Sequence, residues 1–322
     1  MSPPRLLHRS ITLVSSPYHV GVRSHKVGSG PDFLKTNGLE TALSRLGFEV
    51  NHVELEYVDD FEGEIGRSFE LIRRTSTAVT TALERSSFPI VLSGNCSASV
   101  GAAAGFNAYH YGVQEQMGND AQDPVCEGQG KEGSLLSSVW FDAHDDFNTP
   151  DTVMSGYFDS QGIAMLGGEC WRGLLGTVPG HRPMDLQKQL IHVGMRDVNE
   201  LERKRVIDAK LDVIWGREHE KVDYIPLLRE LLDKKKLGLT MVHLDLDCLD
   251  VSIGRANQYS APGGLFEDDL LGCFEVITQH TQPVCLTVSS FDPSLEGADR
   301  IASVAVAAIV KLIQPLIRSG ID

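Results

Sequence analysis

Two short stretches of the chain carry residue types that bind metal ions. The first, VWFDAHDDFNTPDT (residues 139–152), places Asp142, His144 and Asp146 directly after a short apolar run. If that run is a strand that continues through the motif, the two-residue period of side chains puts these three groups on one face. Two carboxylates and an imidazole in that arrangement suit a divalent cation. Without a cation the carboxylates would repel each other and one would have to bind a proton.

The second stretch, LTMVHLDLDCLD (residues 239–250), repeats the arrangement with Asp245 and Asp247 on one face of another expected strand. A structural cluster of carboxylates, neutralised by lysine or arginine, is the alternative for both stretches. Neither stretch contains a lysine or arginine, so we favour metal binding. His243 shares the face of Asp245 but lies further back. We expect it to support the ligands or fill the core rather than bind the metal, which is the alternative.

Composition restricts the class of partner. The 322 residues carry a formal net charge of −15, which argues against nucleic acid and anionic membranes as partners. The six cysteines show no paired spacing, so reduced thiols are expected rather than a disulfide framework. No segment has the length and apolar character of a signal peptide or a transmembrane span. We therefore expect a soluble cytoplasmic protein.

Apolar periodicity predicts strands that alternate with helices along the chain. The expected strands are residues 11–15, 48–55, 89–92, 139–142, 189–193, 213–214, 241–247 and 284–289. The expected helices are residues 40–46, 64–85, 98–109, 156–166, 198–205, 224–236, 268–279 and 300–317, the last ending or kinking near Pro315. This alternation predicts a parallel sheet with helices on both faces and ligands at the carboxyl ends of its strands.

The same pattern predicts a single domain over residues 1–322, because neither an internal repeat nor a linker is visible. Residues 112–136 are rich in Gly, Gln, Asp and Glu and lack periodicity. A solvated surface insertion is favoured there, with an ordered lid as the alternative. Gly28-Ser29-Gly30-Pro31 is expected to be a sharp break before the helix at 40–46.

The order of the motifs resembles the arginase/ureohydrolase family, which includes arginase, agmatinase and formiminoglutamase. The resemblance covers nearly the whole chain and rests on GSGP (28–31), SGNCS (93–97), DAHDDFNTPDT (142–152), SGYFD (155–159) and HLDLDCLD (243–250). It implies a three-layer α/β/α fold with a central parallel sheet of about eight strands. It also implies a binuclear manganese centre, whose bridging hydroxide attacks a guanidinium or amidine carbon.

Within this resemblance, Asp142 and Asp245 match the two bridging aspartates. His144 and Asp247 complete one metal site, while Asp146 belongs to the other and orients the hydroxide. Oxygen-rich ligands with some imidazole suit Mn²⁺, and a metal-bound water ionises near neutral pH. We therefore expect one or two Mn²⁺ ions.

Cys96 departs from the family pattern, because it stands where the family has a histidine ligand. A thiolate ligand there would favour a softer cation such as zinc, or would leave the position weakly occupied. The alternative is a small buried thiol beside a single-metal site.

Two further departures concern the substrate. Asp159 stands where ureohydrolases carry a histidine near the guanidinium, and we expect it to take part in catalysis. Ser290 stands where they carry the glutamate that binds the guanidinium, and Glu296 is a weaker candidate to replace that glutamate. Residues 257–259 are expected either to line the mouth of the pocket or to form a plain structural loop.

Asn148 and Ser155 match residues that hold an amino-acid head group, so a small polar or amino-acid-like substrate is expected. The leading hypothesis is a metal-dependent hydrolase of a linear C–N bond in an amidine, guanidino or amide compound, and not an ordinary arginase. One alternative uses the metal as a Lewis acid in non-hydrolytic biosynthetic chemistry. The other is a catalytically silent, arginase-like binding protein. We also expect a homo-oligomer.

Overall fold

The computed structural model describes residues 8–59, 62–116 and 133–316. Its main sheet has eight strands in the order β4-β1-β5-β10-β9-β6-β7-β8, and every neighbouring pair is parallel. A separate antiparallel pair joins β2 (Tyr18–His19) to β3 (Val22–Arg23). The strands of the main sheet are β1 (Ser10–Ser16), β4 (Glu49–Glu54), β5 (Ser87–Ser93), β6 (Ser137–Phe141), β7 (Leu190–Val193), β8 (Asp212–Ile214), β9 (Leu239–Asp245) and β10 (Gln282–Ser289).

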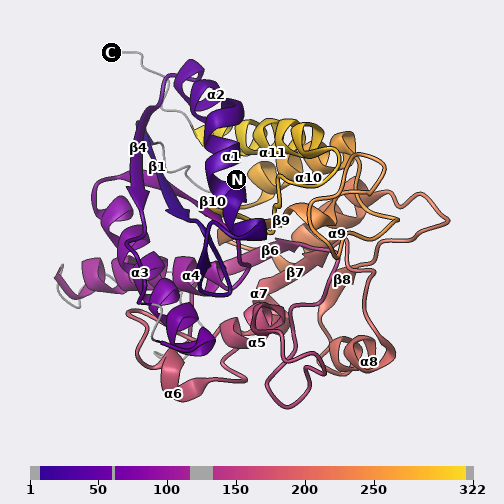
Figure 1. Cartoon of the computed structure of the whole chain (residues 1–322), viewed down its shortest axis with the longest axis horizontal. Coiled ribbons are helices and arrows are strands. Elements are labelled where there is room, and N and C mark those ends of the chain that lie inside the picture. The colour runs from indigo at the N-terminus through magenta and orange to yellow at the C-terminus, as the bar shows by residue number, and fades with distance from the viewer. Residues whose placement is uncertain (1–7, 60–61, 117–132, 317–322) are drawn as a thin grey trace.

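Helices cover both faces of this sheet and bury a separate apolar core against each face (Figure 1). One face carries α3 (Glu64–Glu84), α4 (Ala98–Gln116), α5 (Gly162–Leu166), α6 (Arg172–Leu175), α7 (Leu186–Gln189) and α8 (Glu200–Asp208). The other carries α1 (Gly30–Leu34), α2 (Glu40–Arg45), α9 (Tyr224–Lys235), α10 (Glu267–His280) and α11 (Ala298–Ile313). The predicted three-layer α/β/α architecture with a parallel eight-stranded sheet is therefore confirmed.

The central strands are buried along almost their whole length because helices cover both of their faces. Every residue of β5 is buried, as are all but the first residues of β9 and β10, because both faces of these strands meet helices. The strand β4 lies at the edge of the sheet, and only Val50 and Val53 in it are half-buried while the rest are exposed. Small residues in α4 allow it to approach α3 closely: a Cβ on Gly101 or Gly105 would collide with the carbonyl oxygen of Ile72 or Ser76.

Several expected boundaries are corrected. Helix α4 continues to Gln116, into the segment expected to be an insertion. Residues 117–132 lie outside the described residues, so the insertion stays a prediction, as does the single domain. The expected helix at 156–166 is a 3₁₀ turn (Phe158–Gln161) followed by α5. Gly30-Pro31 begins α1 instead of breaking the chain, since proline fits the first helical turn, where no N–H partner is needed.

Candidate metal centre

Both ligand motifs begin where a central strand stops. Strand β6 ends at Phe141 and β9 at Asp245, so the expectation that each strand continues through its motif is wrong. The physical reason is the same in both places. Asp142 Oδ1 accepts the backbone N–H of His144 at 2.8 Å, and Asp245 Oδ1 accepts that of Asp247 at 2.7 Å. Such local bonds from a side chain to the backbone compete with the sheet ladder and turn the chain out of it.

These turns bring a first group of four side chains together. One ligand atom from each of Cys96, Asp142, His243 and Asp245 lies within 4.8 Å of the other three, and all four residues are buried. Cys96 comes from the loop between β5 and α4, and its thiol donates a hydrogen bond to Asp245 Oδ2 at 2.9 Å. We call this group the cysteine cluster.

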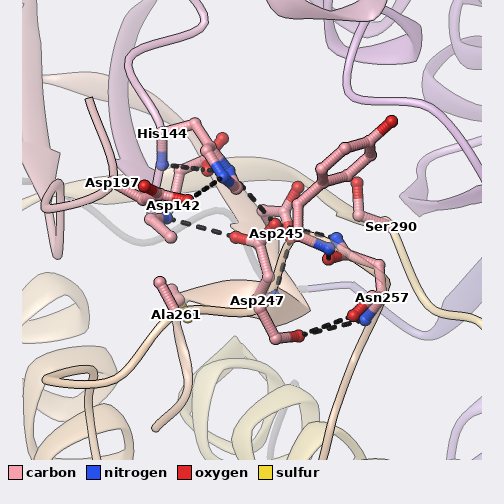
Figure 2. A network of polar contacts seen from close by, with 12 residues as sticks. Asp142, His144, Asp197, Asp245, Asp247, Asn257, Ala261 and Ser290 are labelled. Carbon is pink, nitrogen blue, oxygen red and sulfur yellow. Dashed lines mark hydrogen bonds and ion pairs between the residues drawn. The ribbon is translucent and has the colours of Figure 1, made fainter. Parts of the chain in front are cut away.

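A second group joins Asp142, His144 and Asp247, again with ligand atoms within 4.8 Å of one another, and we call it the histidine cluster. His144 Nδ1 lies 3.4 Å from Asp142 Oδ1 and 3.2 Å from Asp247 Oδ2 (Figure 2). Its Nε2 lies 3.4 Å from Asp197 Oδ2. Asp142 belongs to both clusters, so it is the residue through which the two sites are joined.

The charges of these carboxylates are poorly compensated within the protein. Burial raises the pKa of Asp142 to about 6, and the charge of Asp247 adds to the effect. Burial and the same neighbour also raise the pKa of Asp245. Burial opposes ionisation of Asp247 too, but His144 outweighs it and lowers the pKa of that carboxyl. In the described part of the chain, no lysine or arginine forms an ion pair with these three aspartates. A divalent cation fits this donor set, because it supplies the missing positive charge.

Asp146 is buried beside the clusters but belongs to neither of them. Its backbone has a φ of 44°, a left-handed conformation that non-glycine residues seldom adopt. Its Oδ2 atom has no hydrogen-bond partner, and burial, followed by the charge of Asp142, raises its pKa. The predicted metal-ligand role of Asp146 therefore stays a prediction, although its carboxylate lines the same cavity as Cys96 and His144.

Asp159, expected to act in catalysis, lies at the amino end of α4. Its Oδ2 accepts hydrogen bonds from Asn95 Nδ2 at 2.7 Å and from the backbone N–H of Cys96 at 2.9 Å. Its Oδ1 accepts the backbone N–H of Ser97 at 2.9 Å. Its catalytic role stays a prediction, and these contacts assign it the positioning of the Cys96 loop.

A cavity of about 200 Å³ opens beside both clusters. The three expected substrate-binding residues Asn148, Ser155 and Ser290 all line it. Asn148 is held by hydrogen bonds to Glu202 and Thr152. The Ser290 hydroxyl lies 3.3 Å from Cys96 Sγ. Glu296 is not among the described residues that line this cavity.

The sequence did not predict the residues whose hydrogen bonds position the candidate ligands. Asn257 Nδ2 donates to Asp247 Oδ2 at 2.8 Å, so the 257–259 segment reaches the metal cluster and also lines the cavity. Arg196 donates to backbone carbonyl oxygens on three segments and so ties the end of β9 to its neighbours. Its acceptors are Gly194, Asp247, Cys248, Leu249, Ala261 and Pro262. No local pattern in the sequence marks Arg196, because its partners are main-chain atoms distant along the chain.

The sequence and the fold were both compared with those of known proteins. The model of the Arginase family matches residues 9–314. The chain belongs to the arginase family. The arginase of Bacillus caldovelox is 23% identical over 316 residues, covering 94% of this chain and 98% of that relative. The crystal structure of arginase from Bacillus subtilis superposes with a TM-score of 0.77 at 21% identity, covering 94% of this chain and 98% of that one.

A second branch of the arginase family has the same fold. The formimidoylglutamase of Bacillus subtilis gives a TM-score of 0.64 at 17% identity and covers 98% of this chain and 88% of that one. At such identities the structural likeness establishes the fold alone. Together with the family match, it confirms the resemblance drawn from the motifs. No helix in the described ranges combines the length and apolar character needed to cross a membrane.

Proposed function

We propose that this arginase-family protein is a metal-dependent hydrolase that cleaves a linear C–N bond in a small amidine, guanidino or amide compound. The observation that carries the proposal is the sharing of Asp142 by two ligand clusters that border one cavity. Asp142, Asp245, Asp247 and His144 would hold the cations, and their mostly oxygen ligands suit manganese. A cation in such a site lowers the pKa of water and so supplies a nucleophile near neutral pH.

The roles of the other side chains follow from their contacts. The buried Asp146 carboxylate has an oxygen without a partner, and burial raises its pKa. We assign it the orientation of the attacking water and the acceptance of its proton, because this carboxylate lines the cavity beside both clusters and keeps an oxygen without a partner. Asn257 and Arg196 keep Asp247 in place through the hydrogen bonds described above.

The cavity supports a small polar substrate whose reacting end is not an ordinary guanidinium. Ser290 offers a hydroxyl where a carboxylate would be needed for a bidentate, charge-assisted contact. Asp159 does not replace that contact, because both its oxygens already accept hydrogen bonds from the Cys96 loop. Asn148 and Ser155 remain at the cavity wall to hold a polar or amino-acid-like end.

The test is a screen of the full-length protein, supplied with manganese, for release of urea, ammonia or amine from guanidino, amidine and amide compounds. We expect turnover of at least one compound and its loss in Asp142→Ala. Metal-loaded protein that releases product from no member of any class would contradict the proposal and favour non-hydrolytic or binding roles. A cytoplasmic location and a homo-oligomeric state belong to the same proposal and are checked by cell fractionation and light scattering.

A further inference from the structure

The ring of His243 is held in one orientation by its neighbours on the sheet. It lies on β9 between Trp140 of β6 and Thr287 of β10, which are its register partners. The Trp140 ring stacks against it with centroids 3.7 Å apart and an interplanar angle of 30°. His243 is completely buried. Its ring nitrogens therefore point in directions that the fold fixes.

The two nitrogens of this ring have different surroundings. Nδ1 lies 2.7 Å from Thr287 Oγ1 and 2.8 Å from Ser99 Oγ, and both hydroxyls are themselves buried. Nε2 is buried with no hydrogen-bond partner in the described part of the chain. A metal-binding histidine characteristically uses one ring nitrogen for a hydrogen bond that fixes the tautomer and leaves the lone pair of the other for the ion. In His243, Nδ1 makes such hydrogen bonds and Nε2 keeps its lone pair free.

His243 also lies beside three further ligands. A ring nitrogen of His243, the Cys96 sulfur and a carboxylate oxygen each of Asp142 and Asp245 lie mutually within 4.8 Å. The Cys96 thiol donates to Asp245 Oδ2 at 2.9 Å. A thiol proton shared with a carboxylate is the kind of proton that a cation displaces, because both atoms then bind the ion.

We propose that Cys96, His243, Asp142 and Asp245 form a zinc-selective site, unlike the histidine cluster, which offers only carboxylates and one imidazole. Four ligands of sulfur, nitrogen and two oxygens match the tetrahedral coordination and mixed ligand preference of zinc. Manganese favours oxygen-rich, six-coordinate sites and gains little from sulfur. The chain thus supplies an imidazole from β9 to a site whose loop residue, at position 96, is a cysteine instead of a histidine.

This proposal deepens the proposed function, on whose metal centre it rests, but it concerns which ion binds and where. It is tested by binding rather than by turnover. Zinc bound through Cys96 and His243 in a protein that hydrolyses nothing would support it and contradict the hydrolase. Hydrolysis that manganese alone supports, and that Cys96 and His243 do not affect, would support the hydrolase and contradict the zinc site.

The full-length protein, stripped with a chelator, is titrated with Zn²⁺ and Mn²⁺ separately and in competition, and bound metal is counted by mass spectrometry. Wild type is expected to retain one zinc against about a hundredfold excess of manganese, in keeping with the order of affinities for such ligands. With Co²⁺ as the probe, the spectrum should contain a charge-transfer band from the thiolate. Zinc binding no tighter than manganese binding, or a cobalt spectrum without that band, would overturn the proposal without recourse to any variant.

Variants locate the ligands. His243→Leu should weaken zinc binding by about a hundredfold or more. The matched control is His8→Leu, which removes another buried histidine, one that contacts the Ser86 carbonyl oxygen and belongs to neither cluster. It should leave zinc affinity within about threefold of wild type. Cys96→Ala should abolish the cobalt–thiolate band, whereas Cys285→Ala, at another buried cysteine, should not. Equal zinc affinities in the two histidine variants would rule out His243 as a ligand.

Discussion

The carboxylate of Asp159 accepts the backbone N–H of Cys96 at 2.9 Å, so it holds in place the loop that carries a candidate ligand. The other two donors, Asn95 Nδ2 and the Ser97 N–H, come from the same loop. Backbone N–H groups at the start of a helix have no partner within the helix, and the helix dipole favours a negative charge there. Asp159 therefore links the segment that lines the cavity to the amino end of α4.

We expect Asp159→Asn to destabilise the protein by about 1–3 kcal/mol, because a neutral amide accepts these hydrogen bonds less well and loses the favourable charge. Chemical denaturation measures the change. The control is Asp185→Asn, which alters an exposed cap of the short helix α7 and should cost less than about 0.5 kcal/mol. Equal losses in the two variants would show that the buried contact with Cys96 has no special importance.

Metal content should fall in steps that follow cluster membership. Asp142 belongs to both clusters, so Asp142→Ala should remove all specifically bound metal, whereas His144→Ala should affect only the histidine cluster. The metal-dependent part of the stability, about 2.7 kcal/mol at a metal concentration a hundredfold above Kd, should disappear in Asp142→Ala. Elemental analysis and thermal unfolding with and without metal measure both effects, with the exposed Asp208→Ala as the control. Wild-type metal content in Asp142→Ala would contradict the site assignment.

Stability should decrease with acid because of His192. Burial lowers the pKa of this ring to about 3 from the ordinary value of 6.5. The unfolded chain therefore gains a proton below pH 6.5 that the folded chain does not bind until about pH 3. The contribution is complete above pH 6.5 and is lost as the pH falls towards 3, by up to about 1.4 kcal/mol per pH unit.

Denaturation curves between pH 7 and 4.5 test this expectation. His192→Leu should show a shallower decline than wild type, and His219→Gln, at an exposed histidine, should not change the slope. The slope rather than the absolute stability is compared, since leucine also changes the packing. Equal slopes for wild type and His192→Leu would contradict the expectation, because they would mean that the ring binds a proton equally well in the folded and unfolded states.

Activity towards ordinary ureohydrolase substrates should be low. Ser290 cannot provide a charged partner for a guanidinium, and losing such a partner costs several kcal/mol, or roughly a thousandfold in rate. With manganese supplied, we expect urea release from L-arginine or agmatine below about 0.01 per second. An arginase assayed in parallel verifies the method. Turnover of about 10 per second would contradict this expectation and show that the protein hydrolyses an ordinary ureohydrolase substrate.

The layers, the number of strands in the main sheet and their parallel arrangement agree with the sequence prediction, because they follow from the alternation of strand and helix patterns along the chain. Boundaries were less predictable where local hydrogen bonds compete with the ladder. The end of β9 is one case: Asp245 accepts the Asp247 N–H, which ends a strand that apolar periodicity alone would extend. The end of α4 is another, since the run up to Gln116 is polar and has no apolar periodicity that would mark it as a helix.

The candidate site was predictable to the extent that its ligands share short motifs. Asp142, His144, Asp245 and Asp247 come together as their spacing indicates. The relation of His243 to Cys96 could not be read from the sequence, because it depends on the register of two strands and the start of a distant helix. The contact of Asn257 with Asp247 was missed for a related reason, since a loop residue gives no periodic signal.

Trp140 gives the protein a built-in optical reporter. Its indole N–H donates to Asp142 Oδ2 at 3.1 Å, and its ring is completely buried against His243. Indole emission responds to nearby charge and to the strength of the indole hydrogen bond. A cation that binds Asp142 should therefore change the fluorescence of Trp140. The other two tryptophans, Trp171 and Trp215, are only partly buried, which separates their emission from that of the buried ring. Occupancy of the centre can therefore be followed in real time, without a label and without a known substrate.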